Sequence, residues 1–414
     1  MTRLRQPENA LIVHDGDGLQ DAVDLGNGIF MSRGISNSYL VTTDDGDVLV
    51  NAGVAHQADE LARRISAVSD GPIKVIVFTQ SHPDHTGGWS RFDAPGVDTI
   101  AQANFHHVRG YWIGLEAFSR ARIAKLWGGD LQAPSGPRPP EPVLTTTFFD
   151  SYTFDLGGRR FELYSVPGGE TLDSLVVWLP DDRIVFTGNM TGPIFGHVPN
   201  LYTVRGDKIR YVDWFIKSVQ RVIDLEPDVL ITGHGEPLRG AAEVNRRLAQ
   251  IRDAAVYLRD RTFEGMNAGV DLWTLMGSIS LPPELAIPQG HGKVPWIVRA
   301  IWEEHVGWFR YESTTELYDV PPRAVWPDLV GLAGGPDALA ARGRSYLDAE
   351  HPLHALHLTD IALDVDPESR DALEVRLGAV TMLLERSGRE NFSEVRWLES
   401  EVRDTSAALK RSTQ

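Results

Sequence analysis

The sequence predicts an α/β fold followed by an all-α region. Short apolar runs of strand length recur as far as about residue 232, and one of them, Val75–Phe78, ends in a loop rich in metal ligands. Beyond residue 240, apolar residues recur at three- and four-residue spacing, which is typical of amphipathic helices. We therefore expect an α/β domain over residues 1–240 and a helical domain over residues 241–414.

The first part of the chain alternates strand and helix patterns. Apolar runs at Ser38–Thr42 and Val48–Val50 flank a Thr-Asp-Asp-Gly-Asp turn, which predicts a hairpin. Helical spacing over residues 57–68 predicts a helix that crosses over to the strand Val75–Phe78. A short strand is expected at Val97–Ile100, and residues 114–127 are expected to form an aromatic and basic helix. The aromatic stretch before it, with His106 and His107, is expected to lie on a helix at the mouth of a substrate site.

The later elements follow from the same periodicities. Four strands are predicted at Thr147–Phe154, Arg160–Val166, Leu175–Leu179 and Ile184–Thr187. In the helical region a helix is predicted over Val244–Thr262, and Gly265–Gly269 is expected to break it. Four more helices are predicted at Asp337–Ala349, His351–Asp364, Ser369–Ser387 and Asn391–Lys410. Ser369 is expected to cap its helix.

The composition is that of a globular protein. Of 414 residues, 42% are apolar and 23% are charged, and the absence of cysteine excludes disulfides, thiolate ligands and a cysteine nucleophile. The first thirty residues lack the apolar core of a secretory signal, and no apolar run approaches the ~18 residues of a membrane span. We expect a cytoplasmic protein without membrane contact. The net charge of −17 argues against nucleic acid as a partner.

The loop after Val75–Phe78 carries the clearest chemical signal. His82, Asp84 and His85 lie within four residues, directly after a strand end, where sites form in α/β sheets. Imidazole and carboxylate suit zinc and other borderline first-row metals. The loop therefore predicts a metal site.

The segment TQSHPDHTGG, residues 79–88, resembles the metal-binding loop T-H-x-H-x-D-H-x-G-G of the metallo-β-lactamase superfamily, with Gln80 in place of the first histidine. The resemblance implies an αββα sandwich and further ligands at later strand ends. Glu170 and Asn189 stand where that superfamily has its third histidine and its bridging aspartate. His234, in a Gly-His-Gly-x-Pro turn, matches its last metal histidine.

Two regions are similar to the alkyl sulfatases of that superfamily. Those enzymes carry a glutamate ligand at the position of Glu170 and an N-L-Y-T-x-R-G segment, found here at residues 200–206. Residues 241–322 resemble their helical dimerisation domain, and the aromatic residues Trp302 to Tyr311 suit an interface. The resemblance implies a homodimer that hydrolyses a small anionic ester, most naturally a sulfuric ester, by a metal-activated water.

The resemblance also assigns the ligands to two metal positions. Site one takes Gln80, His82 and Glu170; site two takes Asp84, His85 and His234; and Asn189 is the bridge. A neutral amide is a poorer ligand than imidazole or carboxylate, so we expect zinc at site two. Site one is expected to be weak, empty, or occupied by a metal such as manganese or iron. Asp84 and Glu170 are the predicted catalytic residues, with Glu170 free to act as a general base if site one is empty.

The predicted substrate contacts are the cations Arg205 and Lys293, with hydrogen bonds from Tyr202 and Asn200. Two other interpretations stay open. The chain acts on a different ester (a phosphate ester, lactone or thioester), since one fold hosts many chemistries. Alternatively, it is a dimeric binding protein without catalysis, in which Gln80 and Asn189 mark a decayed metal site.

Overall fold

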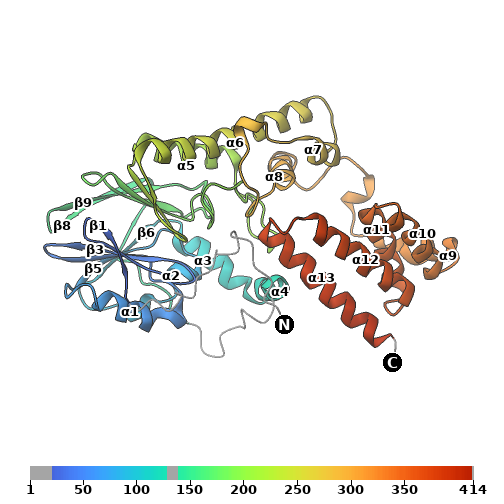
Figure 1. The fold of residues 1–414 in the computed structure, drawn as a ribbon, viewed down its shortest axis with the longest axis horizontal. Helices are drawn as coiled ribbons and strands as arrows, with labels where there is room; N and C mark the ends of the chain where they lie inside the picture. The colour runs from blue at the N-terminus through green and yellow to red at the C-terminus, as the bar shows by residue number, and fades with distance from the viewer. Residues whose placement is uncertain (1–20, 128–138, 413–414) are drawn as a thin grey trace. The chain divides into compact units, whose positions relative to one another are not determined.

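The computed structural model describes residues 21–127 and 139–412 (Figure 1). The segments up to Ser119 and from Ala133 to Glu304 form one compact unit, and the segments Arg120–Gln132 and His305–Gln414 form a second. The first unit continues past the expected boundary at residue 240, so the functional division at that point stays a prediction. The first twenty residues, on which the expected lack of a secretory signal partly depends, lie outside the described part.

Two mixed sheets form the centre of the first unit. The first sheet has the strand order β1-β2-β3-β4-β5-β6-β7, and the second has the order β13-β12-β11-β10-β9-β8. The strands of the first sheet are β1 Val23–Gly26, β2 Ile29–Ser32, β3 Ser38–Thr43, β4 Gly46–Val50, β5 Ile73–Val77, β6 Asp98–Gln102 and β7 Thr146–Phe148. Those of the second are β8 Ser151–Leu156, β9 Arg159–Ser165, β10 Leu175–Leu179, β11 Ile184–Gly188, β12 Val229–Thr232 and β13 Leu238–Arg239.

Helices pack on the outer faces of both sheets. The helical segments of the first unit are η2 Ala55–Gln57, α1 Ala58–Ser66, α2 Pro83–Thr86, η3 Trp89–Arg91, α3 Phe105–Gly114, α5 Val212–Asp224, α6 Ala241–Asn267, α7 Leu272–Ser278, η5 Pro283–Leu285 and α8 Val294–Val306. Of these, α1 packs on the first sheet and α5, α6 and α8 pack on the second. Helix α4 Glu116–Trp127 lies in the second unit from Arg120 on. Alternation along the strands buries side chains on both faces of each sheet. The fold is the expected αββα sandwich.

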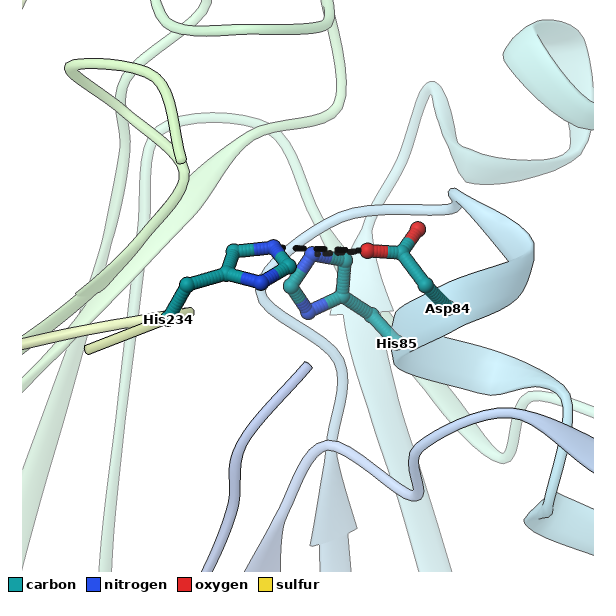
Figure 2. A group of neighbouring side chains, drawn as sticks. All are labelled: Asp84, His85 and His234. Carbon is teal, nitrogen blue, oxygen red and sulfur yellow. Dashed lines mark ion pairs between the residues drawn. The ribbon is translucent and has the colours of Figure 1, made fainter. Parts of the chain in front are cut away.

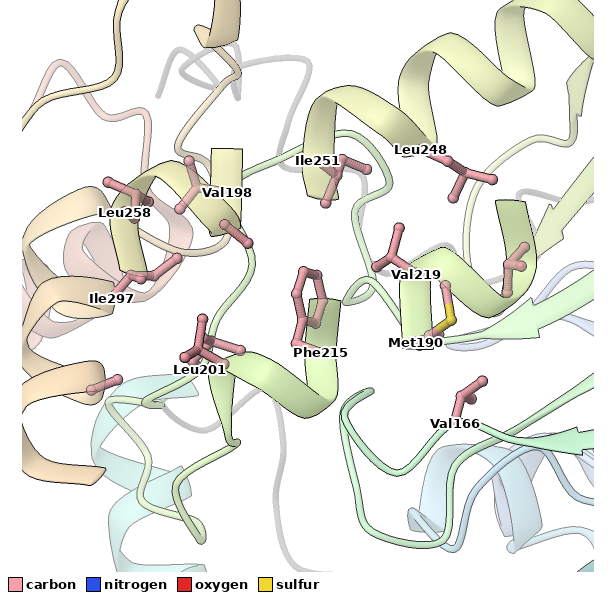
Figure 3. Packing of buried hydrophobic residues seen from close by; sticks show 14 of the residues in the cluster. Val166, Met190, Val198, Leu201, Phe215, Val219, Leu248, Ile251, Leu258 and Ile297 are labelled. Atoms are coloured by element: carbon pink, nitrogen blue, oxygen red, sulfur yellow. The ribbon is translucent and has the colours of Figure 1, made fainter. Parts of the chain in front are cut away.

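Three apolar cores hold these layers together. The inner core joins residues of the two sheets, such as Val77 and Phe186. A second core packs α1 against the outer face of the first sheet through Leu61 and Ile65. The third packs α5, α6 and α8 against the second sheet. Figure 3 shows Phe215 of α5 with Leu248 and Ile251 of α6 and Ile297 of α8.

One local prediction is wrong. The strand expected over Thr147–Phe154 is two strands in different sheets, because the chain leaves β7 at Phe149, which is 79% exposed, and enters β8. The break expected over Gly265–Gly269 is confirmed, since α6 ends at Asn267 and Gly269 follows with a positive φ of 71°. A Cβ on Gly265 would lie 2.3 Å from Cδ2 of Leu275, so this glycine allows α7 to pack closely.

The second unit is helical, as predicted. Its elements after α8 are η6 Thr314–Leu317, η7 Pro322–Val325, α9 Trp326–Ala333, α10 Pro336–Asp348, α11 Pro352–Val365, α12 Arg370–Arg386 and α13 Phe392–Arg411. Ser369 caps α12 by accepting a hydrogen bond from the Ala372 amide, which confirms the predicted cap. None of the helices in residues 21–127 and 139–412 has the length and apolar character that a membrane crossing requires.

Candidate metal centre

The predicted ligands gather where several strands end. Asp84 and His85 lie on α2, whose first residue, Pro83, has the fixed backbone angle that suits a helix start. His234 follows β12, and Gly233 beside it permits close approach, because a Cβ there would lie 2.3 Å from Oδ1 of Asn189. The sheets therefore bring ligands distant in sequence to one place.

Asp84, His85 and His234 form a compact group (Figure 2). One ligand atom from each lies within 4.8 Å of the others. The Asp84 Oδ2 atom is 3.3 Å from His85 Nε2 and 3.5 Å from His234 Nε2. Both ring nitrogens of His85 are buried without a hydrogen-bond partner among the described residues. A donor set of two imidazoles and one carboxylate, with unpartnered buried nitrogens, fits a zinc-type metal.

The protonation states of this group also suit a metal. Burial lowers the pKa of His85 to about 4, so its imidazole is neutral at pH 7. Burial alone would raise the pKa of Asp84, but His85 and His234 outweigh it and hold that pKa well below its ordinary value. A neutral imidazole and an ionised carboxylate are the forms that bind metals.

The residues of the predicted site one interact with one another instead. The amides of Gln80 and Asn189 donate to Oε2 of Glu170, at 3.0 and 2.9 Å. Gln80 Nε2 also lies 2.8 Å from His82 Nδ1, and Asn189 Nδ2 lies 3.3 Å from His234 Nε2. The structure thus places Asn189 between the two groups, while Glu170 is already occupied by amide donors.

Glu170 also faces two arginines. Its Oε1 atom lies 3.7 Å from Nη2 of Arg205 and 3.8 Å from Nη2 of Arg210. Burial alone would raise the pKa of Glu170, but His82, Arg210 and Arg205 outweigh it, so the pKa lies well below the ordinary value. A carboxylate with so low a pKa is a weak base at neutral pH, so the base role of Glu170 remains a prediction that this geometry does not favour.

Aromatic side chains of α3 adjoin these groups. The Trp112 ring meets the His82 ring edge-on at a centroid distance of 5.7 Å, and the Arg205 guanidinium lies 5.7 Å from the centre of a Trp112 ring. Tyr111 donates a hydrogen bond of 3.0 Å to Asp207. The aromatic helix expected near the site is therefore α3.

The sequence analysis missed two residues near Glu170. Arg210 is fully buried and donates to the carbonyl of Asn200, but no motif marks it. Burial lowers the pKa of His291 to about 3, and Glu170, Arg210 and Arg205 act on the same ring. A usable signal existed for His291, because Gly290-His291-Gly292 repeats the Gly-His-Gly pattern around His234.

The other predicted substrate contacts have different surroundings. Asn200 is buried, and its Oδ1 atom has no hydrogen-bond partner among the described residues. Tyr202 packs against the core of the second sheet, and the Arg299 guanidinium lies 5.9 Å from its ring centre. The Lys293 ammonium lies 6.0 Å from the ring centre of Trp296. Contact of these three residues with a substrate stays a prediction.

Comparison with known proteins agrees with this architecture. Residues 31–234 match the family model described as metallo-beta-lactamase superfamily, and residues 275–394 match the model described as alkyl sulfatase dimerisation. Residues 31–234 therefore match a metallo-β-lactamase domain, and a dimerisation region of the alkyl sulfatase type is matched after it. The second match and the relatives below support a likeness to the alkyl sulfatase branch.

The similar proteins support that branch. The chain is 29% identical over 365 residues to a linear primary-alkylsulfatase of Pseudomonas sp. (strain ATCC 19151), an alignment that covers 81% of this chain and 68% of the relative. It is 23% identical over 340 residues to the alkyl/aryl-sulfatase BDS1 of Saccharomyces cerevisiae, covering 75% of this chain and 52% of that protein. The chain therefore spans about half to two thirds of these relatives.

A solved structure shares the fold over nearly the whole chain. The stereoselective inverting sec-alkylsulfatase Pisa1 from Pseudomonas sp. superposes with a TM-score of 0.80 at 21% identity, covering 95% of this chain and 66% of that one.

Proposed function

We propose that this protein is a metal-dependent hydrolase of sulfuric esters. The observation that carries the proposal is the joining of two groups by Asn189: the Asp84–His85–His234 group on one side and the Glu170–arginine group on the other. The first group suits a divalent metal, and the second offers positive charge for an anion. The names of the similar alkylsulfatases support a sulfate ester as that anion.

Asp84, His85 and His234 would hold the metal. When bound, the metal activates water and polarises the ester that is cut. Zinc suits this donor set, with manganese or iron as the other candidates. Since Gln80 and Asn189 donate to Glu170, we propose that this position binds a second metal weakly.

Arg205 and Arg210 would bind the sulfate. Arginine presents several donors in a planar fork, which suits a tetrahedral anion. Glu170 holds both guanidinium groups in place before substrate arrives. The rings of Trp112 and Tyr111 would exclude water from this side of the site, which strengthens the charge interactions.

We also propose a homodimer and a cytoplasmic location. The match to the dimerisation model supports the dimer. Trp308 and Tyr311, within that match, are 72% and 87% exposed, as an interface requires in a single chain. Cell fractionation would test the location.

The test is a substrate panel of alkyl sulfates of several lengths, phosphate esters, lactones and thioesters. We expect sulfate ester hydrolysis, its abolition in His85→Ala, and a fall in kcat/KM of about 10- to 100-fold in Arg205→Ala, because a hydrogen bond to a charged group contributes about 1.5–3 kcal/mol. Arg91→Ala, which breaks an exposed ion pair with Asp59, is the matched control. Activity on another ester alone would reassign the substrate, and metal binding without any hydrolysis would favour the binding protein.

A further inference from the structure

One short segment of the first sheet touches both loops that carry the metal ligands. Residues 33–37 form the turn between β2 and β3. Within that turn, Ser36 and Asn37 are both 2% exposed, although a turn at the end of a hairpin normally lies at the surface. Buried polar side chains need hydrogen-bond partners, and each of these two side chains has one on a metal-binding loop.

Asn37 and its neighbour Tyr39 hold the turn that carries His234. The Asn37 backbone amide donates to the Gly233 carbonyl at 2.7 Å, and its side-chain amide donates to the Gly235 carbonyl at 2.8 Å. The Tyr39 hydroxyl donates to the Thr232 carbonyl at 2.6 Å. Three carbonyls around His234 therefore accept hydrogen bonds from β3 and the turn just before it, in the opposite sheet.

Ser36 holds the other loop. Its hydroxyl donates to the backbone carbonyl of Asp84 itself. Gln57 stabilises the turn over residues 33–37, because its side-chain oxygen accepts a hydrogen bond of 3.0 Å from the Ile35 amide. Consecutive residues thus bind the loop of Asp84 and the loop of His234, which supply ligands from different sheets.

We propose that Ser36 and Asn37 are positioning residues that set the distance between Asp84 and His234, and with it the affinity of the metal site. This inference rests on the proposed metal function. The side chains of Asp84 and His234 approach to 3.5 Å between Oδ2 and Nε2, and Ser36 and Asn37 connect the two loops that carry them. Partners beyond the ligands commonly change metal affinity by about 10- to 100-fold when removed.

The test is metal binding by Ser36→Ala and Asn37→Ala, measured apart from catalysis. Metal-free protein is titrated with Zn²⁺ against a chromophoric chelator, and with Co²⁺ to record the visible spectrum, which reports ligand geometry. We expect each variant to bind Zn²⁺ about 10- to 100-fold more weakly and to change the Co²⁺ spectrum. The matched controls are Ser369→Ala and Asn391→Ala, which remove buried helix caps in the second unit and should lower stability without changing the metal affinity.

Zn²⁺ affinity equal to that of the wild type in both variants overturns the inference. Because Asn37→Ala removes several buried hydrogen bonds, its folding is checked by circular dichroism, and if it does not fold, Ser36→Ala alone decides. The His85→Ala variant distinguishes a failure of the proposed metal centre from a failure of the proposed positioning role. If it binds Zn²⁺ as tightly as the wild type, the proposed metal centre is wrong; if it loses Zn²⁺ while the two variants keep it, only the positioning role is wrong.

Discussion

Replacing two amides should convert the metal centre from one tight position to two. Gln80 and Asn189 both donate to Oε2 of Glu170, so a metal at this position competes with them for the same oxygen. In Gln80→His/Asn189→Asp the donors are gone, and an imidazole and a carboxylate take their places. We expect the wild type to bind one Zn²⁺ tightly and the double variant to bind two.

The hydrogen bonds set the size of the difference. They span 3.0 Å from Gln80 and 2.9 Å from Asn189, and both end on a buried charged group. Each hydrogen bond of this kind contributes about 1.5–3 kcal/mol, so the pair opposes metal binding by about 3–6 kcal/mol. At about 1.4 kcal/mol for each tenfold change, the second Zn²⁺ should bind the wild type roughly two to four orders of magnitude more weakly than the first.

The assay is Zn²⁺ titration of metal-free protein against chelators of graded affinity, with metal content measured by mass spectrometry. Gln102→His is the matched control, since Gln102 is also buried and hydrogen-bonded, to the Phe149 carbonyl, but lies outside both groups. Two Zn²⁺ ions held with similar affinity by the wild type would refute the reasoning. So would a double variant that still binds only one.

Two further predictions concern the second unit. Burial alone would raise the pKa of Glu401, but Lys125 and Arg376 outweigh it and hold the pKa below its ordinary value. The ionised carboxylate therefore stabilises the folded state at pH values above the ordinary carboxyl pKa, and this stabilisation is lost as the pH falls through the lowered pKa. Glu401→Gln should lower Tm at pH 7 and flatten the decline of Tm between about pH 6 and pH 3; parallel curves in calorimetry contradict this. Trp308→Ala and Tyr311→Ala should each weaken dimerisation by about 30-fold, as loss of an aromatic interface anchor does. Unchanged dissociation in analytical ultracentrifugation contradicts the proposed interface.

The sequence was sufficient to predict elements with a clear period. The helices after β13 and the Ser369 cap are confirmed, because apolar spacing and cap residues are local signals. The αββα sandwich, which the resemblance implied, is confirmed as well. The strand expected over Thr147–Phe154 was wrong since its apolar content continues across the point where the chain changes sheet. The helix end expected over Gly265–Gly269 is confirmed, whereas the contact of Gly265 with Leu275 across the fold has no local signal.

Some residues of the candidate site could be predicted from the sequence and others could not. His82, Asp84, His85 and His234 could be found because each follows a strand in a recognisable pattern. The partners of Glu170 could not, since hydrogen-bond geometry depends on how the two sheets meet. Arg210 carries no signal of its own for the same reason.

The state of Glu170 bears on whether the site has decayed. A buried carboxylate without partners is costly, and removing a metal from beside it would leave such a charge. Here Gln80 and Asn189 supply donors to one oxygen, and two arginines face the other. Gln80 and Asn189 are therefore complementary, since each stands where the superfamily pattern has a ligand and each donates to the same oxygen. Independent decay at the two positions has no reason to produce that match, whereas a site that keeps one metal and an arginine pair for an anion requires Glu170 to be satisfied in this way.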